Sequence, residues 1–195
     1  YLSDSQPVAG NDSPKSPNRI LFVGALSSYH NDFLYKQVNS PRSYDIVLYG
    51  SGLETEKLEG KVDYKGFVSS DELIATAEGE YGLAWYGSSL EGGSGALGEY
   101  LQYNAPHKMS LYIRCGLPII VWEKAGLAPF VKKNNVGICI SSLTELEDIL
   151  PKISAGQYME MKKNVLQIAD KLSHGYYCFK AIKQACADLG VEIKG

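Results

Sequence analysis

The sequence lacks both the long apolar run of a membrane-spanning helix and an excess of positive charge. Its longest strongly apolar stretch, 117–122, is far shorter than the ~20 residues that cross a bilayer. Nineteen Lys and Arg residues stand against 22 Asp and Glu residues, which gives a net charge of −3. Nonspecific binding to nucleic acids or anionic membranes needs a basic surface, so we expect neither, although a small local anion site is compatible with this balance.

Cysteine is scarce and poorly spaced for a metal. The four thiols form no C-x-x-C pair and no histidine lies at ligand spacing from them, which argues against zinc. A D-x-D motif is also missing, so no paired carboxylates are evident to hold a divalent metal on a diphosphate, and we expect no metal and no cofactor. Two disulfides are the alternative to the reduced, mostly buried thiols that we favour. The cysteines are Cys115, Cys139, Cys178 and Cys186.

The amino-terminal region has no basic and apolar pattern typical of a signal peptide. Residues 1–18 are polar and rich in Pro and Ser, and we interpret them as a linker or flexible tail of a larger protein. Residues 19–195 are predicted to form one domain. We expect a cytoplasmic protein, either free or at the inner face of the membrane.

From residue 19 onward, short apolar runs alternate with helical segments. Because the runs are continuous rather than alternating, they predict a parallel sheet covered on both faces: a doubly wound, Rossmann-like α/β domain that ends in two longer helices. Ligands of such sheets bind at the carboxyl ends of the strands, where the strand order reverses. The predicted strands are 19–24, 45–50, 62–68, 81–87, 117–122 and 136–140.

The loop after the first strand, GALSS at 24–28, is one candidate site. Gly24 lets a ligand approach the backbone, and the hydroxyls of Ser27 and Ser28 could meet phosphate oxygens. The loop matches neither the dinucleotide fingerprint nor the P-loop. An ordinary strand-to-helix turn is the alternative interpretation.

A second candidate is the glycine-rich stretch 87–106. A loop of this length within a compact domain is usually functional or disordered. We expect disorder over 88–100 in the absence of ligand, either as a substrate lid or as a mobile surface insertion.

The most informative stretch is 103–121, YNAPHKMSLYIRCGLPIIV. Asn104 or a neighbour is predicted to cap a helix whose first turn suits Pro106. His107 and Lys108 lie in that turn, where basic side chains oppose the helix dipole. A bound anion would explain them, and a diphosphate is the natural candidate. A solvated Lys108, and a His107 that only orients the backbone, are the alternatives.

This stretch resembles bacterial galactofuranosyltransferase-like and adhesin-glycosylating glucosyltransferase proteins. The shared pattern is Y-N-x-P-H-K-x-S-x-Y-x-x-x-G-L-P at 103–118, followed by an N-x-G-I turn at 135–138. Further matches run from Ile153 to Tyr176, so the resemblance covers roughly 19–185.

The resemblance implies a GT-B glycosyltransferase, in which two Rossmann-like domains face each other across a cleft. This chain is similar to the carboxyl-terminal half, which binds a nucleotide-sugar donor, usually a UDP-sugar. The amino-terminal domain would then carry the site for a saccharide or glycoprotein acceptor. The implied reaction transfers a hexosyl or galactofuranosyl group to an acceptor hydroxyl, with little or no turnover by this chain alone.

The same resemblance assigns roles to individual residues. Lys108 is expected to be catalytic, because its charge and the helix start stabilise the departing diphosphate without a metal. Asn104 and His107 would place the phosphates, with Ser110 or the backbone holding the ribose. The uracil would lie against the loop 67–69. The expected donor-binding residues are Gly24, Ser27, Ser28, Phe67, Val68, Tyr103, Asn104, Pro106, His107, Lys108 and Ser110.

Three departures from related sequences leave alternatives open. The first loop lacks the lysine of G-N-L-x-K-S, Trp85-Tyr86-Gly87 replaces W-D-G, and the glutamates of E-x7-E are missing. The chain could therefore be a noncatalytic GT-B-like binding or assembly module that has lost its donor. A flavodoxin-like redox or sensory domain is disfavoured, because no acidic cluster follows the first strand. Tyrosine-rich helix ends leave a homo-oligomer open.

Overall fold

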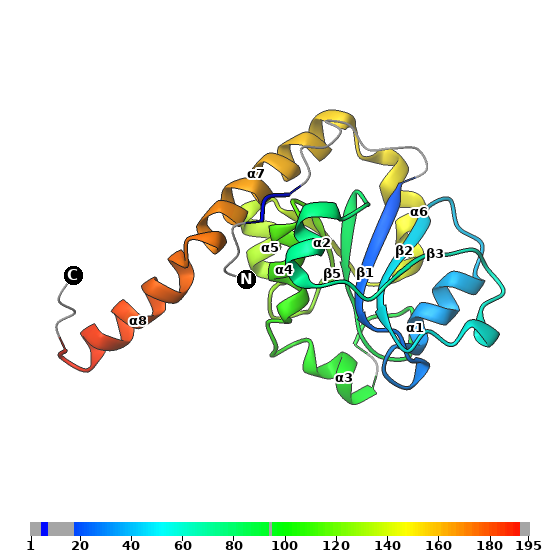
Figure 1. The fold of residues 1–195 in the computed structure, drawn as a ribbon, viewed down its shortest axis with the longest axis horizontal. Helices are drawn as coiled ribbons and strands as arrows, with labels where there is room; N and C mark the ends of the chain where they lie inside the picture. The colour runs from blue at the N-terminus through cyan, green and yellow to red at the C-terminus, as the bar shows by residue number, and fades with distance from the viewer. Residues whose placement is uncertain (1–4, 8–17, 94, 192–195) are drawn as a thin grey trace.

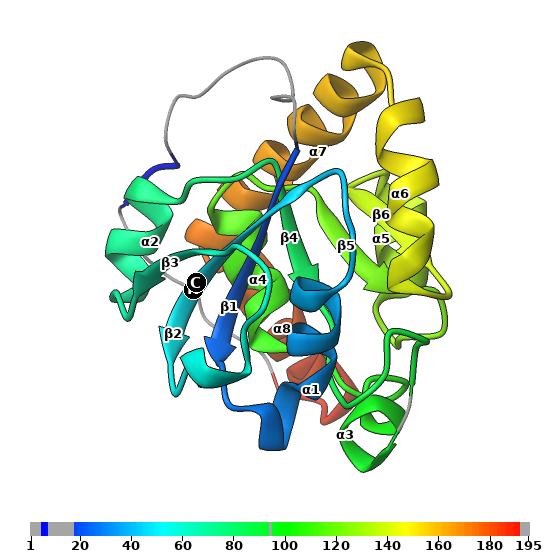
Figure 2. The ribbon, with the colours of Figure 1, turned by 90° about the vertical axis from the view of Figure 1, so that its right-hand side faces the viewer.

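The computed structural model describes residues 5–7, 18–93 and 95–191. They contain one six-stranded sheet in the order β3-β2-β1-β4-β5-β6, with every neighbouring pair parallel (Figures 1 and 2). The doubly wound α/β fold predicted from the apolar runs is confirmed. The strands are β1 (Arg19–Ala25), β2 (Asp45–Ser51), β3 (Asp63–Gly66), β4 (Tyr81–Ala84), β5 (Ile119–Trp122) and β6 (Gly137–Ile140).

Helices cover both faces of the sheet. In Figure 1, α2, α4, α5 and α7 lie on one face, whereas α1 and α6 lie on the other. The α-helices are α1 (Ser28–Asn39), α2 (Ser70–Thr76), α3 (Gly95–Tyr100), α4 (His107–Arg114), α5 (Ala128–Asn134), α6 (Leu146–Ile149), α7 (Ala155–Ser173) and α8 (Tyr176–Asp188). Short 3-10 turns occur at Thr55–Lys57, Leu143–Glu145 and Leu150–Lys152.

The strand order reverses between β1 and β4, and there the sheet opens. β1 pairs with β2 along its whole length, but with β4 at only two positions. Beyond them the hydroxyl of Tyr112, on α4, accepts a hydrogen bond from the N–H of Val23 at 3.0 Å and donates to the carbonyl of Leu83 at 2.9 Å. A Cβ at Gly82 would lie 2.3 Å from Cγ of Tyr112, so the glycine makes room for the ring. Tyr112 therefore joins the two strands where their own hydrogen bonding ends.

Local hydrogen bonds set several helix starts. Ser142 and Glu145 form a capping box at the start of the 3-10 turn Leu143–Glu145. Ser27 is the N-cap of α1, and its side chain accepts a hydrogen bond from the N–H of Tyr29. The predicted cap at Asn104 is wrong: α4 begins at His107 with Pro106 in the N-cap position.

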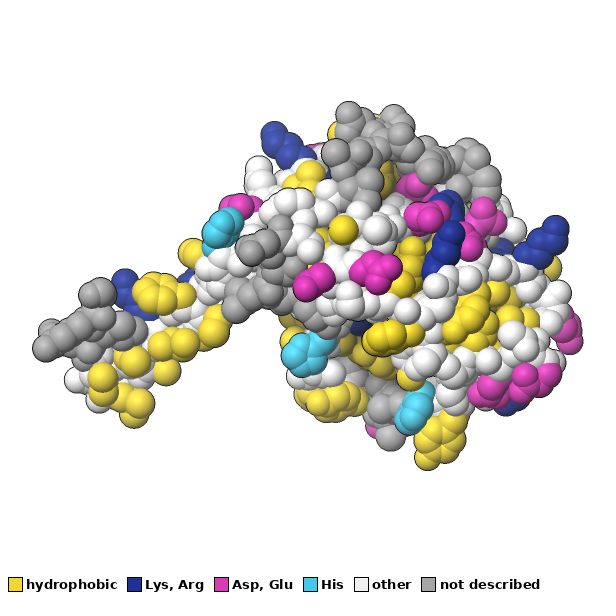
Figure 3. All heavy atoms as spheres, in the orientation of Figure 1, with side chains coloured by type: hydrophobic (Ala, Val, Ile, Leu, Met, Phe, Trp, Pro, Cys, Tyr) yellow, Lys and Arg dark blue, Asp and Glu magenta, His cyan; other side chains and the backbone are white. Residues whose placement is uncertain are grey.

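The two carboxyl-terminal helices differ in their environments. Helix α7 buries Met161, Val165 and Ile168. Helix α8 buries none of its residues and extends away from the sheet (Figure 1). Its side chains Phe179 and Ile182 are 59% and 52% exposed, and hydrophobic atoms gather along it in Figure 3. No described part of the chain covers the apolar face of α8.

Two expectations about the rest of the chain need comment. Buried thiols were expected, but only Cys115 is buried; none of the four cysteines is paired. Most of the proposed linker 1–18 lies outside the described residues, but the carbonyl of Ser5 accepts a hydrogen bond from Arg114 at 2.7 Å. None of the described helices is long and apolar enough to span a membrane.

Replacing Tyr112 by Phe should lower the free energy of unfolding by about 1–3 kcal/mol. The change leaves the N–H of half-buried Val23 and the buried carbonyl of Leu83 without their shared partner, and an unsatisfied buried polar group costs free energy of this size. Urea unfolding measures the effect. Tyr103→Phe is the matched control, because Tyr103 is 85% exposed. Equal stability of Tyr112→Phe and the wild type would contradict the bridging role.

Candidate functional site

A buried lysine lies where the sheet opens, beneath the carboxyl end of β1. Lys108, in the first turn of α4, is 9% exposed. Its Nζ lies 4.1 Å from the ring centroid of Phe22 and 3.9 Å from that of Tyr86. A Cβ at Gly24 would stand 3.9 Å from the same atom. The structure therefore brings together two residues that the sequence singled out, Gly24 and Lys108, at the predicted edge of the sheet.

The charge of Lys108 is not neutralised by the described part of the protein. Lys36, Lys57 and Lys65 each form an ion pair with a carboxylate, whereas no described carboxylate lies within ion-pair distance of Lys108. Burial lowers the pKa of Lys108 to about 7, because the charged form loses hydration. The two aromatic faces act in the opposite direction by stabilising the ammonium. The site thus contains a cation without an internal counter-ion.

The start of α4 adds to this positive potential. Pro106 occupies the N-cap position and supplies no side-chain hydrogen bond, and Asn104 does not cap the helix. The first-turn amides are therefore not satisfied by a capping side chain. The helix dipole places partial positive charge at the same end. The uncapped amides and Lys108 thus belong to the same helical turn.

The neighbouring helix start, at α1, is already occupied by a carboxylate. Glu54 accepts hydrogen bonds from the N–H of Ser28 at 2.8 Å and from its hydroxyl at 3.0 Å. Hydrogen bonding to Lys57, together with these bonds from Ser28, lowers the pKa of Glu54 to about 2. Ser27 meanwhile caps α1. A phosphate at this position would meet the charge of Glu54, so Ser28 is not open to it in this arrangement.

Sequence reasoning missed Glu54, Phe22 and Tyr86. Glu54 follows β2 at the carboxyl edge of the sheet, and this position in the sequence could have identified it as a candidate site residue. In the sequence, Phe22 is one of several apolar residues of the first strand and Tyr86 is one of fourteen tyrosines, so neither stands out as a site residue. Their contact with Lys108 depends on the packing of α4 and leaves no local pattern.

The remaining expected residues follow β3 or lie at the start of α4, and the ring contacts of Lys108 are made by Phe22 and Tyr86 instead. Phe67, after β3, is 79% exposed and Tyr103, before α4, is 85% exposed, so each ring is accessible for stacking. Val68 and Asn104 are half-buried. The hydroxyl of Ser110 donates to the carbonyl of His107 at 2.8 Å.

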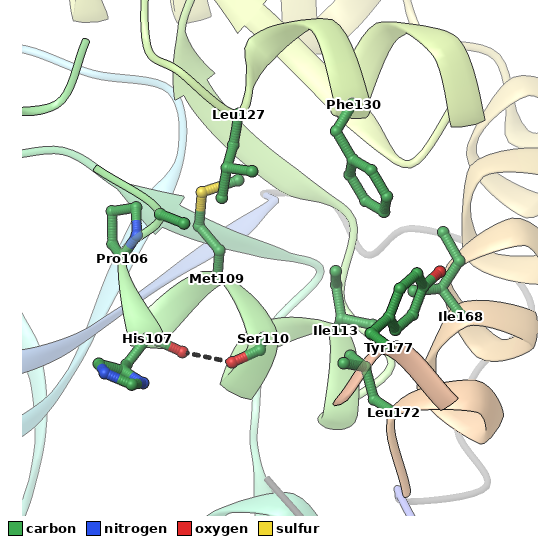
Figure 4. A pocket seen from close by; sticks show the side chains of 11 residues that line it. Pro106, His107, Met109, Ser110, Ile113, Leu127, Phe130, Ile168, Leu172 and Tyr177 are labelled. Atoms are coloured by element: carbon green, nitrogen blue, oxygen red, sulfur yellow. Dashed lines mark hydrogen bonds between the residues drawn. The ribbon is translucent and has the colours of Figure 1, made fainter. Parts of the chain in front are cut away.

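A separate apolar cavity of about 380 Å³ borders another part of α4 (Figure 4). His107 and Ser110 lie at its edge, and the ring of His107 points away from the apolar side chains (Figure 4). Lys108 does not line this cavity. Because the lining is mostly apolar, the cavity is not suited to binding a phosphate. The apolar lining includes Met109, Ile113, Leu127, Phe130, Ile168 and Leu172.

Within the glycine-rich stretch, residues 88–93 are anchored by a backbone hydrogen bond and by packing on a tryptophan ring. The N–H of Gly92 donates to the carbonyl of Ser141 at 2.9 Å. A Cβ at Gly92 would lie 2.0 Å from the indole of Trp122, so the glycine allows the loop to pack flat on this ring. Residue 94 lies outside the described residues. This anchoring counts against the mobile lid expected from the glycine content. The described residues also contain no cluster of three or more His, Cys, Asp or Glu side chains suited to a metal ion.

Comparison with known proteins identifies the family. Residues 20–185 match the glucosyltransferase 3-like, C-terminal domain family. The chain belongs to this family. It is 31% identical over 192 residues to the β-1,6-galactofuranosyltransferase WbbI of Escherichia coli K12, across 97% of this chain and 55% of WbbI. It is 28% identical over 177 residues to glucosyltransferase 3 of Streptococcus gordonii, across 90% of this chain and 50% of that protein. The chain thus spans about half the length of these curated relatives.

Solved glycosyltransferase structures share the fold. Anabaena HepE, in complex with UDP-glucose, superposes with a TM-score of 0.58 at 14% identity, over 87% of this chain and 48% of HepE. Sucrose-phosphate synthase from Thermosynechococcus elongatus gives a TM-score of 0.62 at 14% identity, over 95% of this chain and 49% of the synthase. The expected match to one half of a GT-B glycosyltransferase is confirmed.

Replacing Lys108 by Met should raise the free energy of unfolding at pH 7 by about 1–4 kcal/mol, because the buried charge is removed while the side-chain length is kept. The pKa of Lys108 lies below its unfolded value, so the unfolded chain binds more protons between about pH 7 and 10.5, and wild-type stability rises with pH there. The gain should therefore be full at pH 7 and below, and shrink as the pH approaches 10.5.

Urea unfolding at several pH values measures this difference. Lys133→Met, which changes an exposed lysine of α5, is the matched control and should leave the pH profile unchanged. The same slope between pH 7 and 10.5 in Lys108→Met and the wild type would contradict the burial of a titrating Lys108.

Proposed function

We propose that this chain is the donor-binding half of a glycosyltransferase and that it binds a UDP-sugar with the diphosphate at Lys108. The observation that carries this proposal is the buried ammonium at the start of α4, which has no described carboxylate partner. Gly24 leaves the carboxyl end of β1 open next to it. The complex of HepE with UDP-glucose, on the same fold, supports the choice of nucleotide.

The proposed reaction transfers a hexosyl or galactofuranosyl group from UDP to a hydroxyl of a saccharide or glycoprotein acceptor. As the bond from the sugar to the diphosphate breaks, negative charge develops on the leaving UDP. Lys108 and the amides of α4 would stabilise this charge, and this electrostatic role makes Lys108 the catalytic residue. The names of the relatives, a galactofuranosyltransferase and a glucosyltransferase, support both sugar classes.

The rest of the donor would lie along the same edge of the sheet. We assign the uracil to Phe67 and Val68 after β3, and the phosphates to Asn104 and His107. Tyr103 and Pro106 would flank them, with Ser110 or the backbone near the ribose. Ser27 and Ser28 remain candidates for the phosphates only if Glu54 moves from its present position.

The amino-terminal half of a longer protein is the proposed partner. The relatives are about twice as long as the region matched here. The exposed apolar face of α8 is suited to packing against such a domain. That domain would carry the acceptor site, so we expect little or no turnover from this chain alone.

A noncatalytic binding or assembly module is the second candidate function. It is favoured by the occupied start of α1, where Glu54 takes the place open to a phosphate. On this alternative the chain keeps the fold and has lost the donor.

Thermal unfolding with excess UDP tests the two functions. A ligand at ~100 times its Kd stabilises a protein by about 2.7 kcal/mol, which raises the Tm of a domain of this size by roughly 5–10 °C. We expect this rise with UDP, a smaller one with GDP, and none with UDP in Lys108→Ala. Lys133→Ala, on the exposed surface of α5, should respond like the wild type.

Absence of a Tm shift with UDP would contradict donor binding and favour the noncatalytic module. An equal shift in Lys108→Ala and the wild type would place the diphosphate elsewhere.

A further inference from the structure

The ammonium of Lys108 lies between two aromatic rings that come from opposite sides of the sheet opening. Its distances of 4.1 Å to the Phe22 centroid and 3.9 Å to the Tyr86 centroid are within the ~6 Å range of cation–π attraction. Phe22 belongs to β1, whereas Tyr86 follows the end of β4 at Ala84. The two strands are held in this relation by Tyr112, one turn along α4 from Lys108.

The two rings differ in how firmly they are held. Phe22 is fully buried and packs edge-to-face on Phe33 with centroids 5.5 Å apart, so it forms a fixed inner wall. Tyr86 is half-buried and forms the outer wall. Its neighbour Trp85 is anchored, because the indole N–H donates to the carbonyl of Ser89 at 3.1 Å. Tyr86 is therefore the ring that can be changed without opening the core.

Aromatic walls have a consequence that a carboxylate partner would not have. A carboxylate would neutralise the ammonium, as Glu54 does for Lys57, and an incoming anion would have to displace it. Aromatic faces favour the charged form through their quadrupoles but carry no net charge. The rings therefore stabilise the ammonium without neutralising it, and an incoming anion has no described carboxylate to displace.

We propose that Phe22 and Tyr86 form an aromatic cage that favours the charged form of Lys108 and orients its ammonium, with Tyr86 as a positioning residue for the diphosphate. The diphosphate rests on the proposed function above, whereas the cage itself is a property of the free protein. When the anion binds, Lys108 gains the counter-ion that it lacks, and the cage keeps its Nζ from turning away beforehand.

Few ionisable groups lie near Lys108, so its titration can be followed without overlap from charged neighbours. The strand ends packed against it, 20–25 and 82–89, contain no charged residue. Tyr112 faces the same opening, and burial raises its pKa, so it stays protonated through pH 10. Tyr86 is the ring in direct contact, and the exposed His107 precedes Lys108 in the chain.

The first measurement is the titration of Lys108 without nucleotide, by NMR of protein labelled with ¹³C at the lysine Cε. Lys108→Met assigns the signal by its loss. Tyr86→Phe keeps the ring and should titrate like the wild type, whereas Tyr86→Leu should titrate about 1 pH unit lower, the size expected for the loss of one desolvated aromatic face. Tyr100→Leu, which changes a tyrosine that is 56% exposed, is the control and should not shift the signal.

The second measurement is the affinity for UDP between pH 6 and 9 by calorimetry. Tyr86→Phe should match the wild type. Tyr86→Leu should bind more weakly, with a loss that grows between pH 6 and 8, because more of its Lys108 must take up a proton on binding in this range. The loss should level off at about tenfold at higher pH, where Lys108 is deprotonated in both free proteins. Calorimetry in buffers of different ionisation enthalpy reports that proton uptake. A merely structural role of Tyr86 would weaken binding equally at every pH.

The outcomes separate the cage from the proposed function. If the wild type does not bind UDP, the proposed function fails, but the titration in the free protein still decides the cage. The cage is overturned if Tyr86→Leu titrates like the wild type, or if Tyr86→Phe shifts as far as Tyr86→Leu. Thermal unfolding of each variant checks its folding, and Tyr86→Met removes the ring in a second way if Tyr86→Leu is unfolded.

Discussion

The hydroxyl of Tyr112 connects β1 and β4 where the sheet opens, and the position of the candidate site depends on this connection. Tyr112 and Lys108 are four residues apart on α4, so they lie on the same face of the helix. When the Tyr112 ring enters the space left by Gly82, Lys108 is carried beneath the end of β1. One buried side chain thus closes the sheet and sets the depth at which the ammonium lies.

This placement has an energetic cost that the rest of the fold must offset. A buried ammonium without a carboxylate partner destabilises the folded state, which is why burial lowers its pKa. The offset comes from an extensive core on both faces of the sheet, in which Phe22, Leu21 and Ile20 of β1 are fully buried. A charge that is costly in the free protein is suited to a ligand that brings the opposite charge, and perturbed groups of this kind are common at functional sites.

Helices α1 and α4 both begin at the carboxyl edge of the sheet, but among the described residues only the start of α1 is bound by a side chain of the protein. At α1 the amide and hydroxyl of Ser28 are bound by Glu54, which supplies an anion from within the chain. At α4 no side chain caps the helix, and Lys108 adds positive charge. The positive potential that is free for a ligand is therefore concentrated at α4, and the carboxylate at α1 would repel an anion placed beside it. This asymmetry narrows the proposed diphosphate site to one helix.

The apolar runs were sufficient to predict the strands and their parallel arrangement, because each run is formed by residues close in the sequence. The motif around Lys108 also pointed to the correct family. Contacts between distant residues were not predictable: the placement of Glu54 on Ser28, the packing of Gly92 on Trp122, and the enclosure of Lys108 by Phe22 and Tyr86. The last helix was predicted from the sequence, but only the tertiary structure shows that the apolar face of α8 is uncovered. The physical reason is that burial and partner choice are decided when separate elements pack, and a local pattern does not record which distant side chain fills a given space.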